Sequence, residues 1–135
     1  MEPRGRTFTR EEAEALLPEV DRLLAAAQEL AERLAATEQV AQVEQWKPRT
    51  NGQVSPGSVR HQPVSEQRAL ADQLTKLVDQ IQDMGVVVRD VRTGLIDFPS
   101  LREGRIVYLC WRRGEPLEIR FWHEVRTGFA GRQPL

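Results

Sequence analysis

The chain has 135 residues, close to the size of one domain, and its 40% hydrophobic and 29% charged residues are ordinary for a globular protein. A net charge of −1 provides no overall attraction to nucleic acid or to a membrane surface. No apolar run approaches the ~20 residues that span a bilayer, and the N-terminus lacks a secretory signal pattern. The single cysteine, Cys110, excludes an internal disulfide. We therefore expect one cytoplasmic domain over residues 1–135 with no membrane segment.

The first expected element is a long amphipathic helix that begins after Thr9. Thr9 and Glu12 form a T-x-x-E capping box, which is typical of a helix start. Apolar residues then recur every three or four positions until the pattern fades near Gln45. Pro18 interrupts this stripe and predicts either a kink or a short helix followed by a long one.

A loop and a second helix are expected next. Residues 46–63 contain three prolines, two glycines and an Asn-Gly step, which together predict a mobile loop with a solvated His61. A second apolar stripe predicts a helix from about Ser65 to Met84, and Gly85 is suited to end it. The two stripes should face each other in an antiparallel hairpin.

After the second helix the hydrophobic period changes to two, which predicts strands. Ile106–Trp111 is apolar on both faces, as expected of a central strand. Apolar residues occupy alternate positions in Leu117–Trp122, which puts Glu118, Arg120 and Trp122 on one outer face of the strand. The rest of the chain is expected to be an ordered tail. The expected strands are Val86–Val91, Leu95–Phe98, Ile106–Trp111 and Leu117–Trp122, separated by a turn at Thr93-Gly94, a polar loop over Pro99–Arg105 and a turn over Arg112–Pro116.

The lengths of these elements bear on assembly. The first helix would extend ~50 Å, whereas strands of five or six residues extend only ~17–20 Å. The helical arm should therefore overhang the sheet at Leu30 and Leu34. We expect a second copy of the chain to cover this apolar stripe in a homodimer, and the alternative is that the second helix alone covers it.

The sequence contains none of the standard catalytic motifs. It has no phosphate-binding loop, no dinucleotide-binding glycine pattern, no H-E-x-x-H, no paired C-x-x-C and no G-x-S-x-G. These absences argue against the commonest nucleotide-binding, zinc-protease and serine-hydrolase designs, and the catalytic residues, if any, stay unknown.

Histidine and carboxylates, which are common ligands of zinc or manganese and common acid–base pairs, occur at Asp97, Glu118, His123 and Glu124. The spacing argues against a simple cage, because adjacent His123 and Glu124 point to opposite faces of a continuous strand. His123 has the parity of Phe121, on the apolar side, which favours a structural histidine over a ligand. Asp97 is interpreted as a strand end, a turn residue or a ligand.

The single cysteine, Cys110, lies on the predicted central strand. A buried, inert thiol is the favoured interpretation. A reactive thiol would need an activating neighbour, and His123 could supply one if its strand pairs beside Cys110.

Charge and aromatic residues are unevenly spread along the chain. Residues 1–45 carry a net charge of −5 and residues 85–135 a net charge of +3. In the C-terminal part, aromatic and arginine side chains alternate, a combination that can stack bases and hold phosphates. The near-neutral domain does not favour nucleic acid, and tryptophans packed under arginine stems explain the same residues. The set comprises Trp111, Arg112, Arg113, Arg120, Trp122, Arg126 and Arg132.

Four segments resemble a known family. They are FTREEAEALLP (8–18), GLIDFPS (94–100), GRIVYLCWRRGE (104–115) and EIRFWHEVRTGFAGRQPL (118–135). Together they resemble the uncharacterised prokaryotic family called domain of unknown function 2203, a resemblance that implies no activity. It does mark as site candidates the family motif positions that match here, namely Glu11, Glu12, Asp97, Cys110, Trp111, Glu118, Trp122, His123, Glu124, Gly128, Gly131 and Arg132.

We expect an α+β fold, in which a long antiparallel helical hairpin over residues 9–84 packs on a three- or four-stranded antiparallel sheet within residues 86–135. The leading hypothesis for function is a non-enzymatic binding or assembly module that forms a homodimer through its helical arm. Its binding candidates are Asp97, Cys110, Trp111, Glu118, Arg120, Trp122, His123, Glu124 and Arg132. The alternative is a divalent-metal or metal-dependent acid–base site built from Glu11, Glu12, Asp97, His123 and Glu124.

Overall fold

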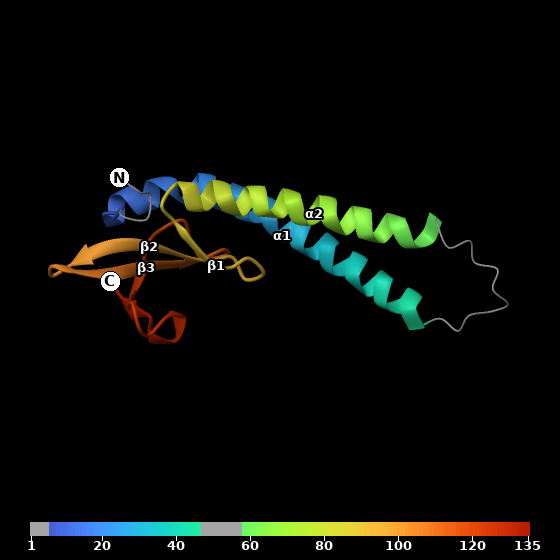
Figure 1. Cartoon of the computed structure of the whole chain (residues 1–135). Helices are drawn as coiled ribbons and strands as arrows, with labels where there is room; N and C mark the ends of the chain where they lie inside the picture. Colours follow the sequence, from blue (N-terminus) through green and yellow to red (C-terminus); the bar gives the residue numbers. More distant parts are fainter. Residues whose placement is uncertain (1–5, 47–57) are drawn as a thin grey trace.

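The structure is a computed structural model that describes residues 6–46 and 58–135. Figure 1 shows two helices that lie along one face of an antiparallel sheet and extend past it at one end. This two-layer arrangement confirms the predicted α+β fold of a helical hairpin and a small sheet. Neither helix in this part of the chain has the length and apolar character needed to cross a membrane.

Helix α1 spans Arg10–Trp46 and begins with the predicted capping box. The Glu12 amide donates a hydrogen bond to Thr9 Oγ1 (3.1 Å), and the Thr9 amide donates one to Glu12 Oε1 (2.8 Å). These bonds satisfy amides that a helix start otherwise leaves without partners. The helix continues through Pro18, which is exposed, so the alternative of two separate helices is wrong.

Helix α2 spans Ser58–Asp83 and begins well before the predicted Ser65. Residues 58–63 of the predicted loop, with His61 among them, are therefore helical, and residues 47–57 of that loop lie outside the described residues. The prediction was wrong for 58–63 because the glycines and two of the three prolines of the predicted loop precede Ser58, and the one proline in this stretch, Pro63, removes a single backbone hydrogen bond.

The chain leaves α2 through Gly85, as predicted. Its φ of 95° lies in the left-handed region that favours glycine. A Cβ atom at this position would lie 3.2 Å from the ring of Phe8, so both the backbone angle and the neighbouring ring require a glycine here.

The sheet has five antiparallel strands in the order β1-β2-β3-β4-β5, which confirms β3 as the central strand. The expected three or four strands become five because the C-terminal tail adds the two-residue strand β5. The strands are β1 (Val87–Asp90), β2 (Leu95–Arg102), β3 (Arg105–Arg112), β4 (Phe121–Glu124) and β5 (Gln133–Pro134).

Strand β2 runs through most of the predicted loop Pro99–Arg105 and ends at Arg102. A two-residue turn at Glu103 and Gly104, with φ of 51° and 77°, connects it directly to β3. Two consecutive positive φ angles give a turn whose twist matches the flanking strands. The polar residues indicated a loop because this end of the hairpin is exposed to solvent.

The fourth predicted strand, Leu117–Trp122, is displaced. Residues 117–120 are irregular, and β4 begins only at Phe121. The irregular segment breaks the alternation, so Ile119 and Trp122 both lie in the core although the prediction put them on opposite faces. The predicted outer position of Trp122 is therefore wrong.

The core fills the space between the helices and the facing side of the sheet. Leu30 is only 8% exposed in the single chain and Leu34 is half-buried, although the helical arm extends past the sheet. Helix α2 packs along α1 and covers Leu30 without a second copy, so the length argument for a dimer loses part of its support. The largest fully buried core residues include Phe8, Leu17, Leu24, Ile81, Ile96, Phe98, Trp111 and Ile119.

Candidate metal centre

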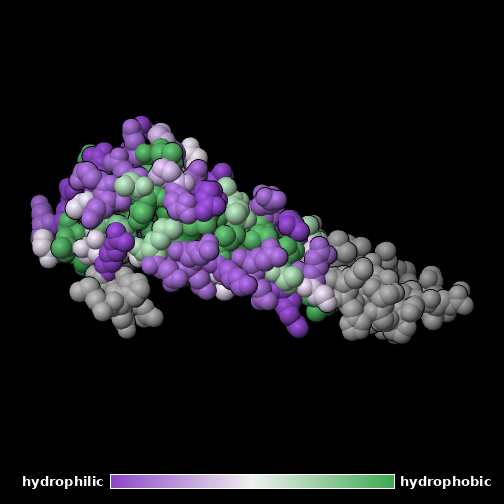
Figure 2. Space-filling model, turned by 90° about the horizontal axis from the view of Figure 1, so that it is seen from above, coloured by the Kyte–Doolittle hydropathy of each residue, from purple (hydrophilic) through white to green (hydrophobic). Residues whose placement is uncertain are grey.

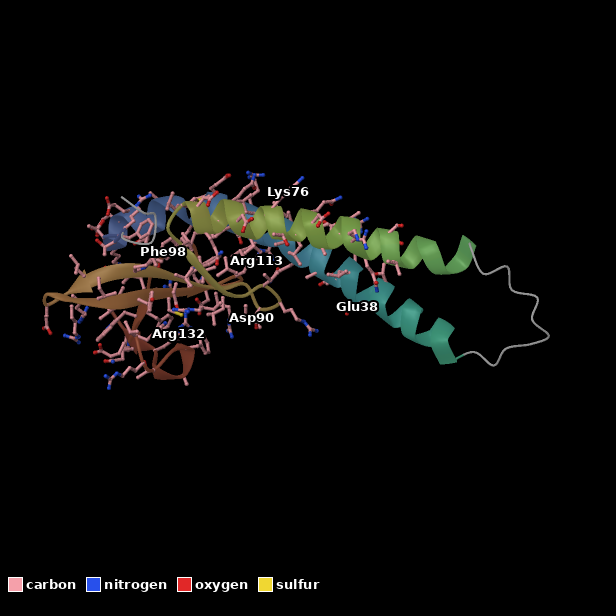
Figure 3. All side chains as sticks on the ribbon, in the orientation of Figure 1. Glu38, Lys76, Asp90, Phe98, Arg113 and Arg132 are labelled. Carbon is pink, nitrogen blue, oxygen red and sulfur yellow. The ribbon has the colours of Figure 1, made fainter. Side chains whose placement is uncertain are left out.

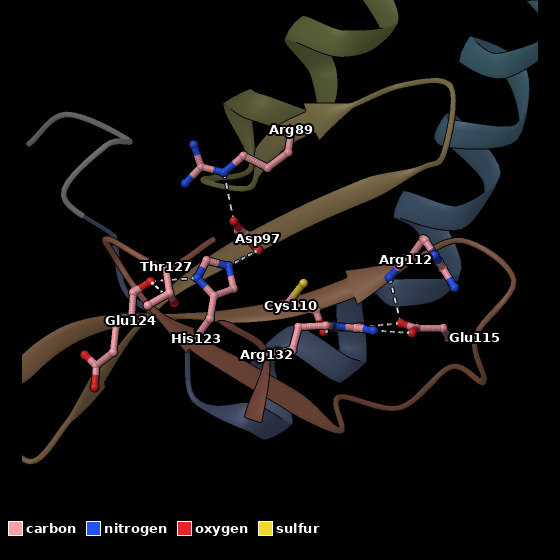
Figure 4. A network of polar contacts seen from close by, with 9 residues as sticks. All are labelled: Arg89, Asp97, Cys110, Arg112, Glu115, His123, Glu124, Thr127 and Arg132. Atoms are coloured by element: carbon pink, nitrogen blue, oxygen red, sulfur yellow. Dashed lines mark hydrogen bonds and ion pairs between the residues drawn. The ribbon is translucent and has the colours of Figure 1, made fainter. Parts of the chain in front are cut away.

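Three polar side chains lie together on the sheet face that points away from the helices. The pairing of β2 with β3 sets Asp97 opposite Cys110, and the pairing of β3 with β4 sets Tyr108 opposite His123. Since side chains alternate along a strand, Asp97, Cys110 and His123 project from the same face. They converge from three neighbouring strands and are 2%, 1% and 1% exposed, respectively (Figure 4).

Both ring nitrogens of His123 have partners. Nδ1 lies 2.8 Å from the backbone carbonyl oxygen of Glu124, and Nε2 lies 3.0 Å from Oδ1 of Asp97. A carbonyl oxygen only accepts hydrogen bonds, so Nδ1 carries a proton and donates it. Nε2 then faces an oxygen of Asp97, and this contact is attractive if a proton lies between the two atoms, on the ring or on the carboxyl group, or if a cation binds both.

Both carboxylate oxygens of Asp97 are engaged. Oδ1 faces His123, and Oδ2 accepts a hydrogen bond from Arg89 Nε at 2.8 Å. The guanidinium of Arg89 also lies over the ring of Tyr108, 4.8 Å from its centre. Burial lowers the pKa of Arg89, but the hydrogen bond and the charge of Asp97 outweigh this effect and raise the pKa above its ordinary value. A partly exposed arginine therefore balances the charge of a buried carboxylate.

Cys110 is buried between the two strands that carry the other two side chains. Burial raises the pKa of its thiol to about 12, and the negative charge of Asp97 adds to the effect. The thiol of the metal-free protein is therefore protonated at neutral pH, which agrees with the predicted inert cysteine. His123 does lie on a strand that pairs with β3, but both its nitrogens are engaged elsewhere, so it does not act as the base of a Cys/His site.

The donor atoms of this cluster are one sulfur, one nitrogen and one oxygen. A thiol sulfur, an imidazole nitrogen and a carboxylate oxygen, from Cys110, His123 and Asp97, all lie within 4.8 Å of one another. Zinc and similar borderline divalent ions bind this combination of donors in proteins. The cluster could hold such an ion after small side-chain movements.

The structure does not assemble the predicted set of Glu11, Glu12, Asp97, His123 and Glu124. Glu11 and Glu12 are exposed on the first turn of α1, which packs on the other face of the sheet, and Glu12 caps that helix. The carboxylate of Glu124 pairs with Arg105 (2.6 and 3.1 Å), so only its backbone carbonyl reaches the cluster. Sequence order could not show that the sheet separates these carboxylates.

The tryptophans among the remaining candidates pack in the core. Trp111 is buried in the core and donates its Nε1 hydrogen to the carbonyl of Pro116 (2.9 Å), and the guanidinium of Arg102 covers the ring of Trp122 at 4.2 Å. Glu118 and Arg120 pair with each other at 2.9 Å, and both are exposed. At these positions the tryptophans pack in the core and an arginine lies over one of them, in line with the packing interpretation.

Arg132 fastens the C-terminal tail beside the cluster, on the side of the sheet that faces away from the helices (Figure 3). Its two terminal nitrogens bond the carboxylate of Glu115 at 2.7 and 2.8 Å, and its guanidinium lies over the rings of Phe121 (4.1 Å) and Phe129 (4.6 Å). One terminal nitrogen also lies 3.5 Å from the carbonyl oxygen of Cys110. Burial raises the pKa of Glu115, but the hydrogen bonds from Arg132 outweigh it and hold the pKa below its ordinary value.

Sequence reasoning missed Arg89 and Glu115, which complete these contacts. Arg89 lies on β1, whose register with β2 shifts between Val88 and Asp90, so simple alternation does not identify its partner. Glu115 lies in a turn 17 residues from Arg132, and nothing in a chain with this many charges singles out that pair.

Comparison with known proteins supplies a family and nothing further. No curated protein and no solved structure matches the chain. The family model described as "Uncharacterized conserved protein (DUF2203)" matches residues 6–135, which include the whole cluster. The chain therefore belongs to the DUF2203 family.

Proposed function

We propose that this protein is a metal-binding module that holds one divalent transition-metal ion, zinc or a close relative, with Asp97, Cys110 and His123. The observation that carries this proposal is the contact of His123 Nδ1 with the carbonyl oxygen of Glu124 at 2.8 Å. Because that nitrogen donates to a carbonyl, the bare nitrogen of a neutral ring is Nε2, and it points at the carboxylate of Asp97 and the thiol of Cys110. Metal-binding histidines are oriented by the same kind of hydrogen bond.

A single proton between His123 and Asp97, with no metal ion, is the rival interpretation of their contact. That hydrogen-bonded pair would need only two residues, whereas the cluster contains three potential ligands. In its ionised form the pair would also need both charges to be desolvated, which is costly in a site this buried. Metal binding gives Cys110 a role and explains why Arg89 holds the second oxygen of Asp97, since such contacts fix a carboxylate that ligates through one oxygen.

Elemental analysis and calorimetry on protein purified without a His-tag test this proposal. We expect one equivalent of zinc, or of added cobalt with a thiolate-to-cobalt charge-transfer band, together with a higher melting temperature. The His123→Gln variant should lose this binding, and the Glu118→Gln variant, altered at an exposed carboxylate outside the cluster, should keep it. Wild-type protein that binds neither zinc, cobalt nor manganese would refute the proposal.

Self-association through the helical arm is the second candidate function. It is favoured by the overhang of the arm beyond the sheet and by Leu34, which lies on that arm and is only half-buried in the single chain. Figure 2 shows hydrophobic residues interspersed with hydrophilic ones on the helical side of the molecule. Light scattering coupled to size exclusion should give twice the mass of the chain, and a monomer at high micromolar concentration would contradict it.

We keep the cytoplasm as the proposed compartment because a reducing environment preserves the single thiol.

A further inference from the structure

We propose that the metal ion keeps one open coordination position on the side of Arg89, and that this position takes a small carboxylate ligand. This inference rests on the metal-binding function proposed above. Its argument has three steps: the number of protein ligands, the balance of charge around the ion, and the position of Arg89.

The number of protein ligands comes first. Within residues 6–46 and 58–135, the cluster supplies three ligand side chains, Asp97, Cys110 and His123. Zinc-like ions usually take four ligands; structural sites obtain all four from the protein, whereas sites that bind a small molecule use three and leave the fourth position open. A site with three protein ligands therefore belongs to the class that leaves the fourth position open for a small molecule.

The balance of charge indicates what fills that position. The two positive charges of the ion would be cancelled by the thiolate of Cys110 and the carboxylate of Asp97, so Arg89, which donates to Oδ2 of Asp97, gives the loaded site a net charge of about +1. The two neighbouring arginines do not change this balance, because Arg132 is paired with Glu115 and Arg105 with Glu124. One bound monoanion would neutralise the loaded site.

The position of Arg89 fits this role. Its Nε holds Oδ2 of Asp97, and a guanidinium also carries two terminal nitrogens that can make paired hydrogen bonds with a carboxylate. The side chain is 41% exposed and lies over Tyr108, whose ring is 5.5 Å from that of His123. Figure 4 shows the guanidinium of Arg89 beside Asp97.

Visible absorption of the cobalt-loaded protein tests the inference with acetate as the probe and perchlorate, a poorly coordinating monoanion, as the control for ionic strength. We expect acetate to change the ligand-field bands saturably, and perchlorate at equal concentration to leave them unchanged. Arg89→Gln should weaken acetate binding by about tenfold or more. Arg120→Gln, which removes an exposed arginine paired with Glu118, should not weaken it.

The outcomes separate the two proposals. Protein that shows no cobalt spectrum at all refutes the metal-binding function. Protein that binds cobalt but shows no response to acetate, or an equal response in wild type and Arg89→Gln, refutes the open position alone. Arg89→Lys serves as a second variant if Arg89→Gln does not fold; it keeps the charge but loses the paired hydrogen bonds, so an intermediate acetate affinity is expected.

Discussion

The ring of His123 is held from two sides, by the Glu124 carbonyl at Nδ1 and by Asp97 at Nε2. At the scale of single residues, the sequence indicated Asp97, Cys110 and His123 as candidates but could not show that they meet. Their meeting depends on two strand registers, and a shift of one residue in either would move a side chain to the other face. The sequence also favoured a structural role for His123, and its burial agrees with that role as well as with ligation.

Cys110→Ser tests the contribution of the sulfur ligand. A hydroxyl is a poorer ligand for zinc than a thiolate, so zinc affinity should fall by about 100-fold or more. Without metal, the free energy of unfolding of the variant should lie within about 2 kcal/mol of the wild-type value. The two side chains are similar in size, and the variant differs only in burying a hydroxyl group instead of a thiol. Calorimetric titration measures the first quantity and urea unfolding the second. Unchanged zinc affinity would remove Cys110 from the site.

At the scale of elements, local signals predicted the starts and ends of elements where one residue type is required. The capping box at Thr9 and the helix end at Gly85 are confirmed because each depends on contacts within a few residues or on a backbone angle. The end of β2 and the start of β4 were misplaced, since both depend on pairing with β3. Solvent-exposed strand ends carry the same polar residues as loops, so composition does not distinguish them.

Gly85→Ala tests the requirement for glycine at the end of α2. A Cβ atom there would meet the Phe8 ring at 3.2 Å and would occupy a left-handed backbone with φ of 95°. We expect the free energy of unfolding to fall by about 2–3 kcal/mol. Gly104→Ala is the matched control: its φ is 77°, but no atom lies within 4 Å of the added Cβ, so about 1 kcal/mol is expected. Urea unfolding compares the two, and equal losses would show that Phe8 contributes nothing.

The contact between Glu115 and Arg132 ties the C-terminal tail to the turn that follows β3, and it should depend on pH. The pKa of Glu115 in the folded protein lies below its ordinary value, so the contact stabilises the fold above the unfolded-state pKa of about 4.3 and loses its effect as pH falls through the folded value. Glu115→Gln should therefore cost about 1–2 kcal/mol at pH 7 and progressively less below about pH 4. Unfolding of both proteins over this pH range measures the difference. If the difference in free energy of unfolding between wild type and Glu115→Gln stayed constant with pH, it would contradict an ionic contribution from the Glu115–Arg132 contact.

At the scale of the whole molecule, amphipathic periodicity was sufficient to predict two helices on one face of an antiparallel sheet. It could not show which sheet face lies under the helices, and this explains the error in the predicted metal ligands. Glu11 and Glu12 on α1 and His123 on β4 belong to opposite sides of the sheet. The far face, which the C-terminal tail partly covers through Arg132, contains the candidate site.

The central claim is that one metal ion is bound by a sulfur, a nitrogen and an oxygen from β3, β4 and β2. X-ray absorption at the zinc edge of the loaded protein measures those bonds directly. The account predicts one sulfur neighbour at about 2.3 Å together with nitrogen and oxygen neighbours at about 2.0–2.2 Å, and loss of the sulfur neighbour in Cys110→Ser. A zinc ion surrounded only by nitrogen and oxygen in the wild-type protein would contradict it.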